Sequence, residues 1–214
     1  MNHRPNTFPA ARSIVDLRSA VRPYYTEKRY IHALGVEKEA AFLGNLLLPD
    51  RVSELQAAAL LHDITKKYDL EKQLKCCAEF GIIMKTPSSP EVIHAVTGAH
   101  VARTDFADYV NEDIFGAIRY HTTGHGGMTV FESILFIADY IEPGRTHEVC
   151  ITLRELLHAR LTEADDAGER ETALSEAVLM ALNNTISYLQ EKQAIIDTDT
   201  VDARNCMLAA MKMR

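Results

Sequence analysis

Histidines and aspartates occur in this sequence at positions where an unpaired polar side chain would be costly to bury. His62 and Asp63 are adjacent at the end of the apolar run "ALLHDITKK", and Asp139 stands inside "ILFIADYI". His32 falls within an amphipathic stripe of the segment "RYIHALGV". Groups of this kind need a strong partner when they are buried. Two imidazoles and two carboxylates from distant segments suit a first-row divalent ion better than Ca²⁺ or Mg²⁺, so the pattern indicates a metal site.

Two further histidines lie in apolar segments, His94 in "EVIHAV" and His121 in "AIRYH". They could ligate a second ion, contact an anionic ligand, or be core histidines bonded to backbone carbonyls. His121 and His125 have HxxxH spacing, but glycines at 124, 126 and 127 interrupt any helix there. This spacing therefore does not predict a metalloprotease-type helical pair, and His125 is predicted to be a loop residue.

Three cations are spaced so that they could serve an anionic ligand near these groups. Lys66 comes one helical turn after His62, Arg29 one turn before His32, and Arg145 follows the helix terminator "EPG". Each would bring positive charge toward the predicted metal. The alternative is that they are solvated helix ends, as most lysines and arginines are. The loop "HTTGHGG" offers hydroxyls that could hydrogen-bond phosphate or ribose.

Helical signals that would position these residues recur along the whole chain, and strand alternation is hard to find. Ser53 and Gln56 have the spacing of a capping box, as do Thr129 and Glu132, and Gly81 is suited to closing a helix. The sequence predicts an all-α fold, a bundle of about eight to nine helices with short loops. These helices are expected to begin near Thr26, Ser53, Asp69, Ser89, Asn111, Thr129, Glu148, Glu171 and Thr200.

Composition narrows the class of protein. The chain has 214 residues and a net charge of −7, whereas a general nucleic-acid binder would usually be basic, so we expect no nucleic-acid partner. No apolar run approaches the roughly 20 residues of a membrane span, and the N-terminus lacks an apolar signal core. None of the four cysteines has CxxC spacing, which fits a reducing compartment. A soluble, cytoplasmic protein without membrane contact is expected.

The order His32, His62-Asp63, Asp139 along a helical chain resembles the HD-domain metallohydrolases. The segments "ALLHDITKK", "HAVTGAHVA", "AIRYHTTG" and "MTVFESILFIADYIEPGR" look like the YqeK-type symmetrical bis(5′-nucleosyl)-tetraphosphatases, a match that extends from about Ser19 to Asn205. The expected organisation is an HD domain with its C-terminal helices at 19–206. It is preceded by a tail and first-helix start at 1–18 and followed by a tail at 207–214.

The resemblance implies a role for each matching residue. The implied metal ligands are His32, His62, Asp63 and Asp139. The implied nucleotide contacts are Arg29, His32, His94, His121, Thr122 and Arg145. The implied catalytic residues are Asp63, Lys66, His94 and His121. The late segment "NNTISYLQ" resembles one that closes over the nucleotide. The implied cofactor is a divalent transition metal, most often iron, with Mn, Co, Ni or Zn as alternatives, and one ion or two stays open.

The implied reaction is symmetrical cleavage of diadenosine tetraphosphate to two ADP by a hydroxide generated on the metal. The nearest alternative is an HD-domain phosphohydrolase acting on a deoxynucleotide, a cyclic nucleotide or a guanosine alarmone. The same residues are compatible with a non-catalytic nucleotide sensor and with an HD-fold di-iron oxygenase. The sequence does not determine base preference or oligomeric state, and a homodimer is one alternative.

Overall fold

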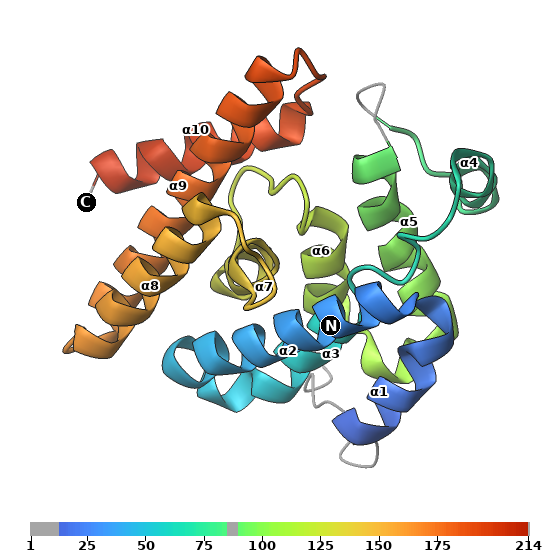
Figure 1. Cartoon of the computed structure of the whole chain (residues 1–214), viewed down its shortest axis with the longest axis horizontal. Coiled ribbons are helices and arrows are strands. Elements are labelled where there is room, and N and C mark those ends of the chain that lie inside the picture. The colour runs from blue at the N-terminus through green and yellow to red at the C-terminus, as the bar shows by residue number, and fades with distance from the viewer. Residues whose placement is uncertain (1–12, 85–89, 214) are drawn as a thin grey trace, which may run out of the picture.

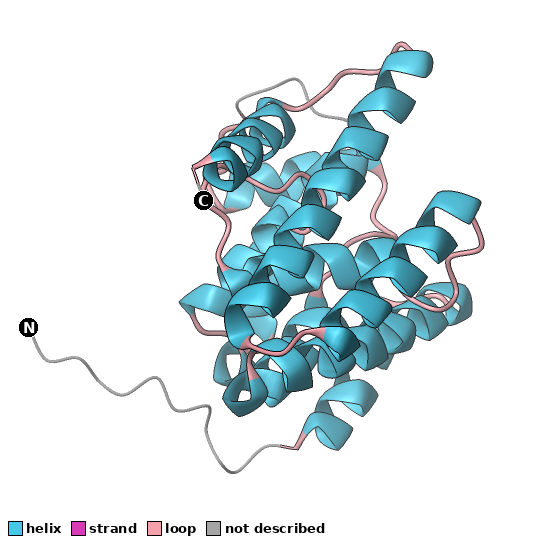
Figure 2. Cartoon of the chain, turned by 90° about the vertical axis from the view of Figure 1, so that its left-hand side faces the viewer, coloured by secondary structure: helices cyan, strands magenta, loops and turns pink. Residues whose placement is uncertain are grey.

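A computed structural model describes residues 13–84 and 90–213 of the chain, and in these residues the fold is entirely helical, as predicted (Figures 1 and 2). These residues form ten α-helices where about eight to nine were expected, and the first, α1, begins at Ile14, within the segment 1–18 that was predicted to hold the tail and the start of a first helix. The helices are α1 (Ile14–Val21), α2 (Glu27–Leu47), α3 (Val52–Leu61), α4 (Leu70–Glu79), α5 (Pro90–Asp105), α6 (Glu112–Tyr120), α7 (Val130–Ile141), α8 (Glu148–Glu163), α9 (Ala167–Glu191) and α10 (Thr198–Lys212).

Four of the nine predicted helix starts are confirmed by their capping hydrogen bonds. The side chains of Thr26, Asp69 and Asn111 each accept a hydrogen bond from a backbone N–H in the first turn of α2, α4 and α6. Thr129 and Glu132 form the reciprocal capping box at the start of α7. Gly81 follows α4 with φ +63°, the left-handed conformation expected of a residue that closes a helix.

Three predicted boundaries need separate comment. The Ser53–Gln56 capping box is wrong, because α3 already begins at Val52, directly after a 3₁₀ turn, and the Gln56 amide donates to Glu37 on α2 at 2.9 Å. The start near Glu171 is late, since Asp166 caps α9 by accepting from the Glu169 N–H. The predicted start at Ser89, like the N-terminal tail over residues 1–12, lies outside the described residues.

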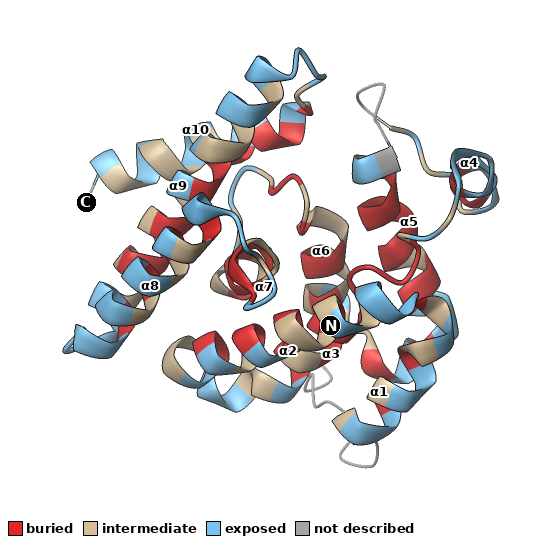
Figure 3. Ribbon diagram, in the orientation of Figure 1, coloured by how far each residue is buried: buried red, intermediate tan, exposed pale blue. Residues whose placement is uncertain are grey.

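Helix α7 lies at the centre of the molecule and fixes the arrangement of the others (Figure 3). It packs against α2, α3, α6, α8 and α9. Eight of its twelve residues are buried, which leaves few positions where a polar side chain could meet solvent. Each buried Ile, Leu or Phe contributes roughly 1.5–3 kcal/mol. The burial holds the last turn of α7, which carries Asp139, in a fixed place relative to α2.

The remaining helices surround this centre in two groups. On one side of α7, α2 pairs with α3, and α5 pairs with α6 and α4. On the other side, α9 packs against both α8 and α10 (Figure 1). α10 continues through Lys212, past the predicted boundary at residue 206. None of the helices in the described ranges is long and apolar enough to cross a membrane.

Candidate metal centre

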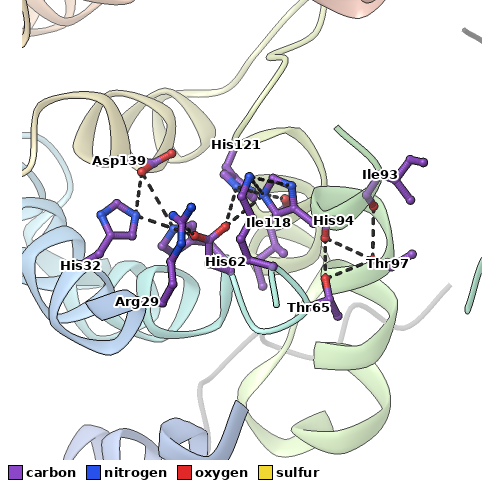
Figure 4. Close-up of polar contacts among 12 residues, drawn as sticks. Arg29, His32, His62, Thr65, Ile93, His94, Thr97, Ile118, His121 and Asp139 are labelled. Carbon is purple, nitrogen blue, oxygen red and sulfur yellow. Dashed lines mark hydrogen bonds and ion pairs between the residues drawn. The ribbon is translucent and has the colours of Figure 1, made fainter. Parts of the chain in front are cut away.

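The structure brings the four predicted metal ligands together from three helices (Figure 4). His32 lies in the second turn of α2, His62 and Asp63 follow directly at the C-terminal end of α3, and Asp139 lies in the last turn of α7. His32 Nε2 is 3.1 Å from Asp139 Oδ1 and 3.8 Å from Asp63 Oδ2. His62 Nε2 is 4.0 Å and 3.6 Å from the same two oxygens. These separations let all four side chains reach one ion.

The rings of His62 and His121 are oriented so that Nε2 keeps its lone pair. His62 Nδ1 lies 2.6 Å from the Ala59 carbonyl oxygen, and His121 Nδ1 lies 2.7 Å from that of Ile118. A carbonyl can only accept a hydrogen bond, so in both rings Nδ1 carries the proton and Nε2 keeps its lone pair. This is the tautomer that a metal-binding histidine requires when it ligates through Nε2.

Burial supplies an independent test of whether a metal fits. His62 is fully buried, and the Nε2 atoms of both His32 and His62 make no hydrogen bond within the described residues, although carboxylate oxygens surround them. Buried polar atoms in folded proteins are normally hydrogen-bonded. Two buried ring nitrogens without a hydrogen-bond partner, facing two carboxylates, are a donor set suited to a divalent metal ion.

The electrostatics of the centre favour an added positive charge. Burial lowers the pKa of His62 to about 4, so this ring is neutral near pH 7. Burial opposes ionisation of Asp63 and Asp139, yet the surrounding histidines, and Arg145 beside Asp139, hold the pKa of both carboxyls well below the usual value. Burial opposes protonation of His32 as well, but hydrogen bonds to nearby carboxylates outweigh it and raise its pKa to about 9. Without an ion, His32 therefore carries a proton that a metal would displace.

His94 and His121 complete a second cluster on the other oxygen of Asp63. Asp63 Oδ1 lies 3.0 Å from His94 Nε2 and 3.7 Å from His121 Nε2, and the two Nε2 atoms are 3.1 Å apart. The Lys66 ammonium lies 3.2 Å from His94 Nδ1. The ammonium is also 3.4 Å from Nε2, but the Asp63 carboxylate at Nε2 can only accept, so His94 carries its proton on Nε2. His94 therefore differs from His62 and His121: it presents a donor to the centre.

The three predicted cations and Thr122 lie around the same centre. Arg29 reaches Asp63 Oδ2 at 3.1 Å, and Arg145 reaches Asp139 Oδ1 at 2.6 Å while its Nε donates to the Asp139 carbonyl at 3.0 Å. Burial lowers the pKa of Lys66. Thr122 lies directly after α6, at the wall of the adjoining pocket. His125 lies in the loop that follows, as predicted, where it contacts Glu132.

A pocket of about 620 Å³ adjoins the centre and has room for a ligand larger than the ion. His121, Thr122, Asp139 and Arg145 form its inner wall, and residues of α7, α8 and α9 form the rest: Phe136, Tyr140, Val149, Cys150, Asn184, Thr185, Ser187, Tyr188 and Glu191, with His147 between Arg145 and α8. A second hollow, of about 750 Å³, lies at the α8–α9 turn and is lined by residues outside both clusters.

Sequence reasoning missed Glu142, which accepts from His32 Nδ1 at 3.1 Å and is itself buried. It is the first residue of the helix terminator "EPG", where a glutamate is ordinarily expected to be a solvated turn residue. The only available signal was its position three residues after Asp139, which keeps it near the same end of α7.

An all-helical fold that gathers two histidines and two aspartates around an ion-sized space defines a helical metallohydrolase-like protein. The HD domain family model matches residues 29–144, more than half of the chain. A symmetrical bis(5′-nucleosyl)-tetraphosphatase of Bacillus subtilis is 32% identical over 89% of this chain and 95% of its own length. One of Halalkalibacterium halodurans with the same name is 33% identical over 90% of this chain and 95% of its own length.

A solved structure resembles the chain over almost its full length. It is described as a predicted HD superfamily hydrolase involved in NAD metabolism from Clostridium acetobutylicum. The two superpose with a TM-score of 0.75 at 30% identity, covering 93% of this chain and 98% of the other. The chain belongs to the HD domain family and, within it, to the group of the symmetrical bis(5′-nucleosyl)-tetraphosphatases.

Proposed function

We propose that this protein hydrolyses diadenosine tetraphosphate symmetrically and releases two ADP. The observation that carries the proposal is that His32 and His62 each lie within 4.0 Å of both Asp63 and Asp139, beside a pocket of about 620 Å³. The names of the two relatives, and their similarity over nearly the whole chain, support the substrate. The net charge of −7 argues against a nucleic-acid partner, and the four free cysteines fit work in the cytoplasm.

The proposed metal ligands are His32, His62, Asp63 and Asp139. We favour iron, although this set of nitrogen and oxygen donors also accepts Mn, Co, Ni or Zn. When bound, a divalent ion at this position supplies Lewis acidity and lowers the pKa of a water molecule near the scissile phosphate. The Nε2 atoms of His32 and His62, which have no hydrogen-bond partner in the described residues, support this assignment.

The protein's own groups have three proposed tasks in the reaction. Arg29, Lys66 and Arg145 offset the negative charge of the polyphosphate and of the transition state. Asp63 has both oxygens turned into the centre, so it can orient the attacking water as well as ligate. His94, with its proton on Nε2, is placed to donate to a phosphate or leaving-group oxygen.

The pocket explains why cleavage would be symmetrical. One nucleoside diphosphate half would occupy the pocket, with Thr122 and Arg145 at its diphosphate and the α9 residues Asn184 and Tyr188 around its nucleoside. The bond between the second and third phosphates would then lie at the centre. We infer that His121 contacts phosphate or supports a second ion through Nε2, which faces His94 Nε2 at 3.1 Å, and the metal stoichiometry distinguishes these two roles.

The test combines metal analysis with product identification on the purified protein. Incubation with diadenosine tetraphosphate and Fe²⁺, Mn²⁺ or Co²⁺ is expected to yield ADP alone, and in ¹⁸O-water one of the two ADP molecules should carry the label. Formation of ATP plus AMP would contradict symmetrical cleavage. Tight nucleotide binding without turnover in any of these metals would instead identify a sensor.

A further inference from the structure

Glu142 is a buried carboxylate that lies behind the metal centre and does not face the ion. Its side chain is about 5% exposed, and Oε1 lies 3.1 Å from His32 Nδ1, on the edge of the ring opposite the Nε2 that faces Asp139. A carboxylate in this position cannot ligate the same ion as Nε2. Its contact with His32 nevertheless determines how that ring is presented.

The surrounding backbone is shaped to hold this carboxylate. The Gly144 N–H donates to Glu142 Oε2 at 2.6 Å, so the helix terminator folds back onto the side chain. On α2, one turn after His32, Gly35 approaches so closely that an added Cβ would lie 2.3 Å from Oε2. A Cβ on Gly144 would lie 2.9 Å from both carboxylate oxygens. Two glycines thus leave the space that Glu142 occupies.

The hydrogen bond to Glu142 fixes which nitrogen of His32 keeps its proton when a metal binds. An ionised carboxylate only accepts, so Nδ1 stays protonated, and Nε2, once it gives up its own proton, presents its lone pair to the centre. His62 and His121 obtain the same tautomer from backbone carbonyls. Of these three rings, His32 alone is held by a side chain, and a charged acceptor makes the ring a stronger donor to a metal than a carbonyl does.

We propose that Glu142 is the positioning residue of His32: it orients the ring, sets its tautomer and so strengthens metal binding at the centre. The inference rests on the proposed metal-dependent function but concerns metal affinity, not substrate choice. Glu142 contacts neither the ion nor the nucleotide pocket in this arrangement, so its effect on catalysis passes through His32.

Metal affinity of the nucleotide-free protein tests the proposal. Dissociation constants for Mn²⁺ and Co²⁺ would be measured by competition with a chelator after metal removal. Glu142→Ala is expected to weaken binding about 10–100-fold, the usual range for loss of such a partner. Glu142→Gln should lie between Glu142→Ala and the wild type, because its amide oxygen can still accept from Nδ1 without the charge. The visible spectrum of bound Co²⁺ should change in both variants.

A matched control is available elsewhere in the fold. Glu39 is equally buried and accepts from His158 Nε2 at 2.6 Å, far along α2 from the centre. Glu39→Gln removes the charge of a second Glu–His pair, as Glu142→Gln does at the centre, and should leave metal affinity within twofold of the wild type. A drop caused by general loosening of the core would appear in this control as well.

A second variant keeps the carboxylate but displaces it. Gly35→Ala puts a methyl group where Glu142 Oε2 lies, and it should weaken metal binding in the same direction as Glu142→Ala. If Glu142→Ala does not fold, the metal affinities of Glu142→Gln and Gly35→Ala still test the proposal. Folded variants that bind both metals within twofold of the wild type overturn the inference. Because no nucleotide is present, this failure is separate from a failure to hydrolyse diadenosine tetraphosphate.

Discussion

Asp63 makes more contacts with the candidate centre than any of its proposed co-ligands. Oδ2 faces Arg29, His32 and His62 at 3.1–3.8 Å, and Oδ1 faces His94 at 3.0 Å and His121 at 3.7 Å. It can share one ion with His32 and His62 and another with His94 and His121. One side chain therefore connects the proposed metal ligands with the residues that would touch phosphate.

Removing this carboxylate should separate activity from folding. Asp63→Ala is expected to lower turnover of diadenosine tetraphosphate by about 10²–10⁴-fold or more, since a ligand and a water-orienting group are lost together. The helical far-UV circular dichroism should persist, because the apolar burial of α3 and α7 is untouched. Asp113→Ala, which removes a carboxylate paired with Arg51 at 2.7 Å, is the control and should keep activity. A fully active Asp63→Ala variant would remove Asp63 from the mechanism.

The difference between the ligands and Glu142 explains which site residues a sequence can predict. His32 and Asp139 interrupt apolar helical patterns, so their need for a partner is visible without a structure. Glu142 sits at a helix end in a polar turn, where exposure is the ordinary expectation. Its burial depends on the approach of Gly35 from α2, a contact over more than a hundred residues that no local pattern encodes.

At the scale of elements, four predicted helix starts have the capping side chain that the sequence indicated, whereas the predicted start of α9 is late although Asp166 caps that helix. Thr26, Asp69, Asn111 and Thr129 cap their helices through short-range bonds. α3 begins without a side-chain cap, out of a 3₁₀ turn, and Gln56 is drawn to a partner on α2. Tertiary contact therefore overrides the capping signal at Ser53.

The loop after α6 shows how a distant helix supports the site. This loop carries Thr122 and is packed against α10: a Cβ on Gly124 would lie 3.0 Å from Ala203 Cβ and from Met128 Sδ. Gly124 also has φ +65°, a conformation that side chains disfavour. α10 thus packs behind the residues that follow His121 and supports their position.

Two glycines of this loop allow the support by α10 to be tested separately from backbone strain. Gly127 has φ +84° but open space around it, so Gly127→Ala should cost only the left-handed conformation, about 1–2 kcal/mol. Gly124→Ala adds a clash with α10 and should cost about 1–3 kcal/mol more. Urea denaturation measures both, and kcat/KM for diadenosine tetraphosphate should fall further for Gly124→Ala. Equal destabilisation by the two variants would mean that α10 does not support the loop.

At the scale of the whole molecule, the described structure places three acidic side chains and four histidines at the junction of two helix groups. α2, α3, α5 and α6 supply one side, and α7, which packs against α8 and α9, supplies the other. Charges gathered there are costly to bury, so the state of the centre should affect the stability of the entire fold. Stability as a function of pH and metal is therefore a readout of the centre that needs no substrate.

The metal-free protein should be most stable near pH 6–7. The pKa of His62 and of His94 is about 4 in the fold against 6.5 in the unfolded chain, so between pH 6.5 and 4 the unfolded chain binds more protons and stability falls as the pH falls. The pKa of His32 is raised to about 9, so the stability that its protonated ring contributes is complete below pH 6.5 and is lost as the pH rises through 9. Each pKa unit corresponds to about 1.4 kcal/mol.

Bound metal should abolish the loss of stability at alkaline pH, because an ion replaces the proton on His32. It should also make stability fall more steeply at acid pH, because protons compete with the ion for the ligands. Thermal unfolding from pH 4 to 9.5, in a chelator and then in saturating Mn²⁺ below the pH of hydroxide precipitation, measures both effects. His32→Gln is the control: its metal-free melting temperature should no longer fall between pH 7 and 9. A wild-type profile in chelator that keeps rising through this range would show that His32 is not the group that loses its proton.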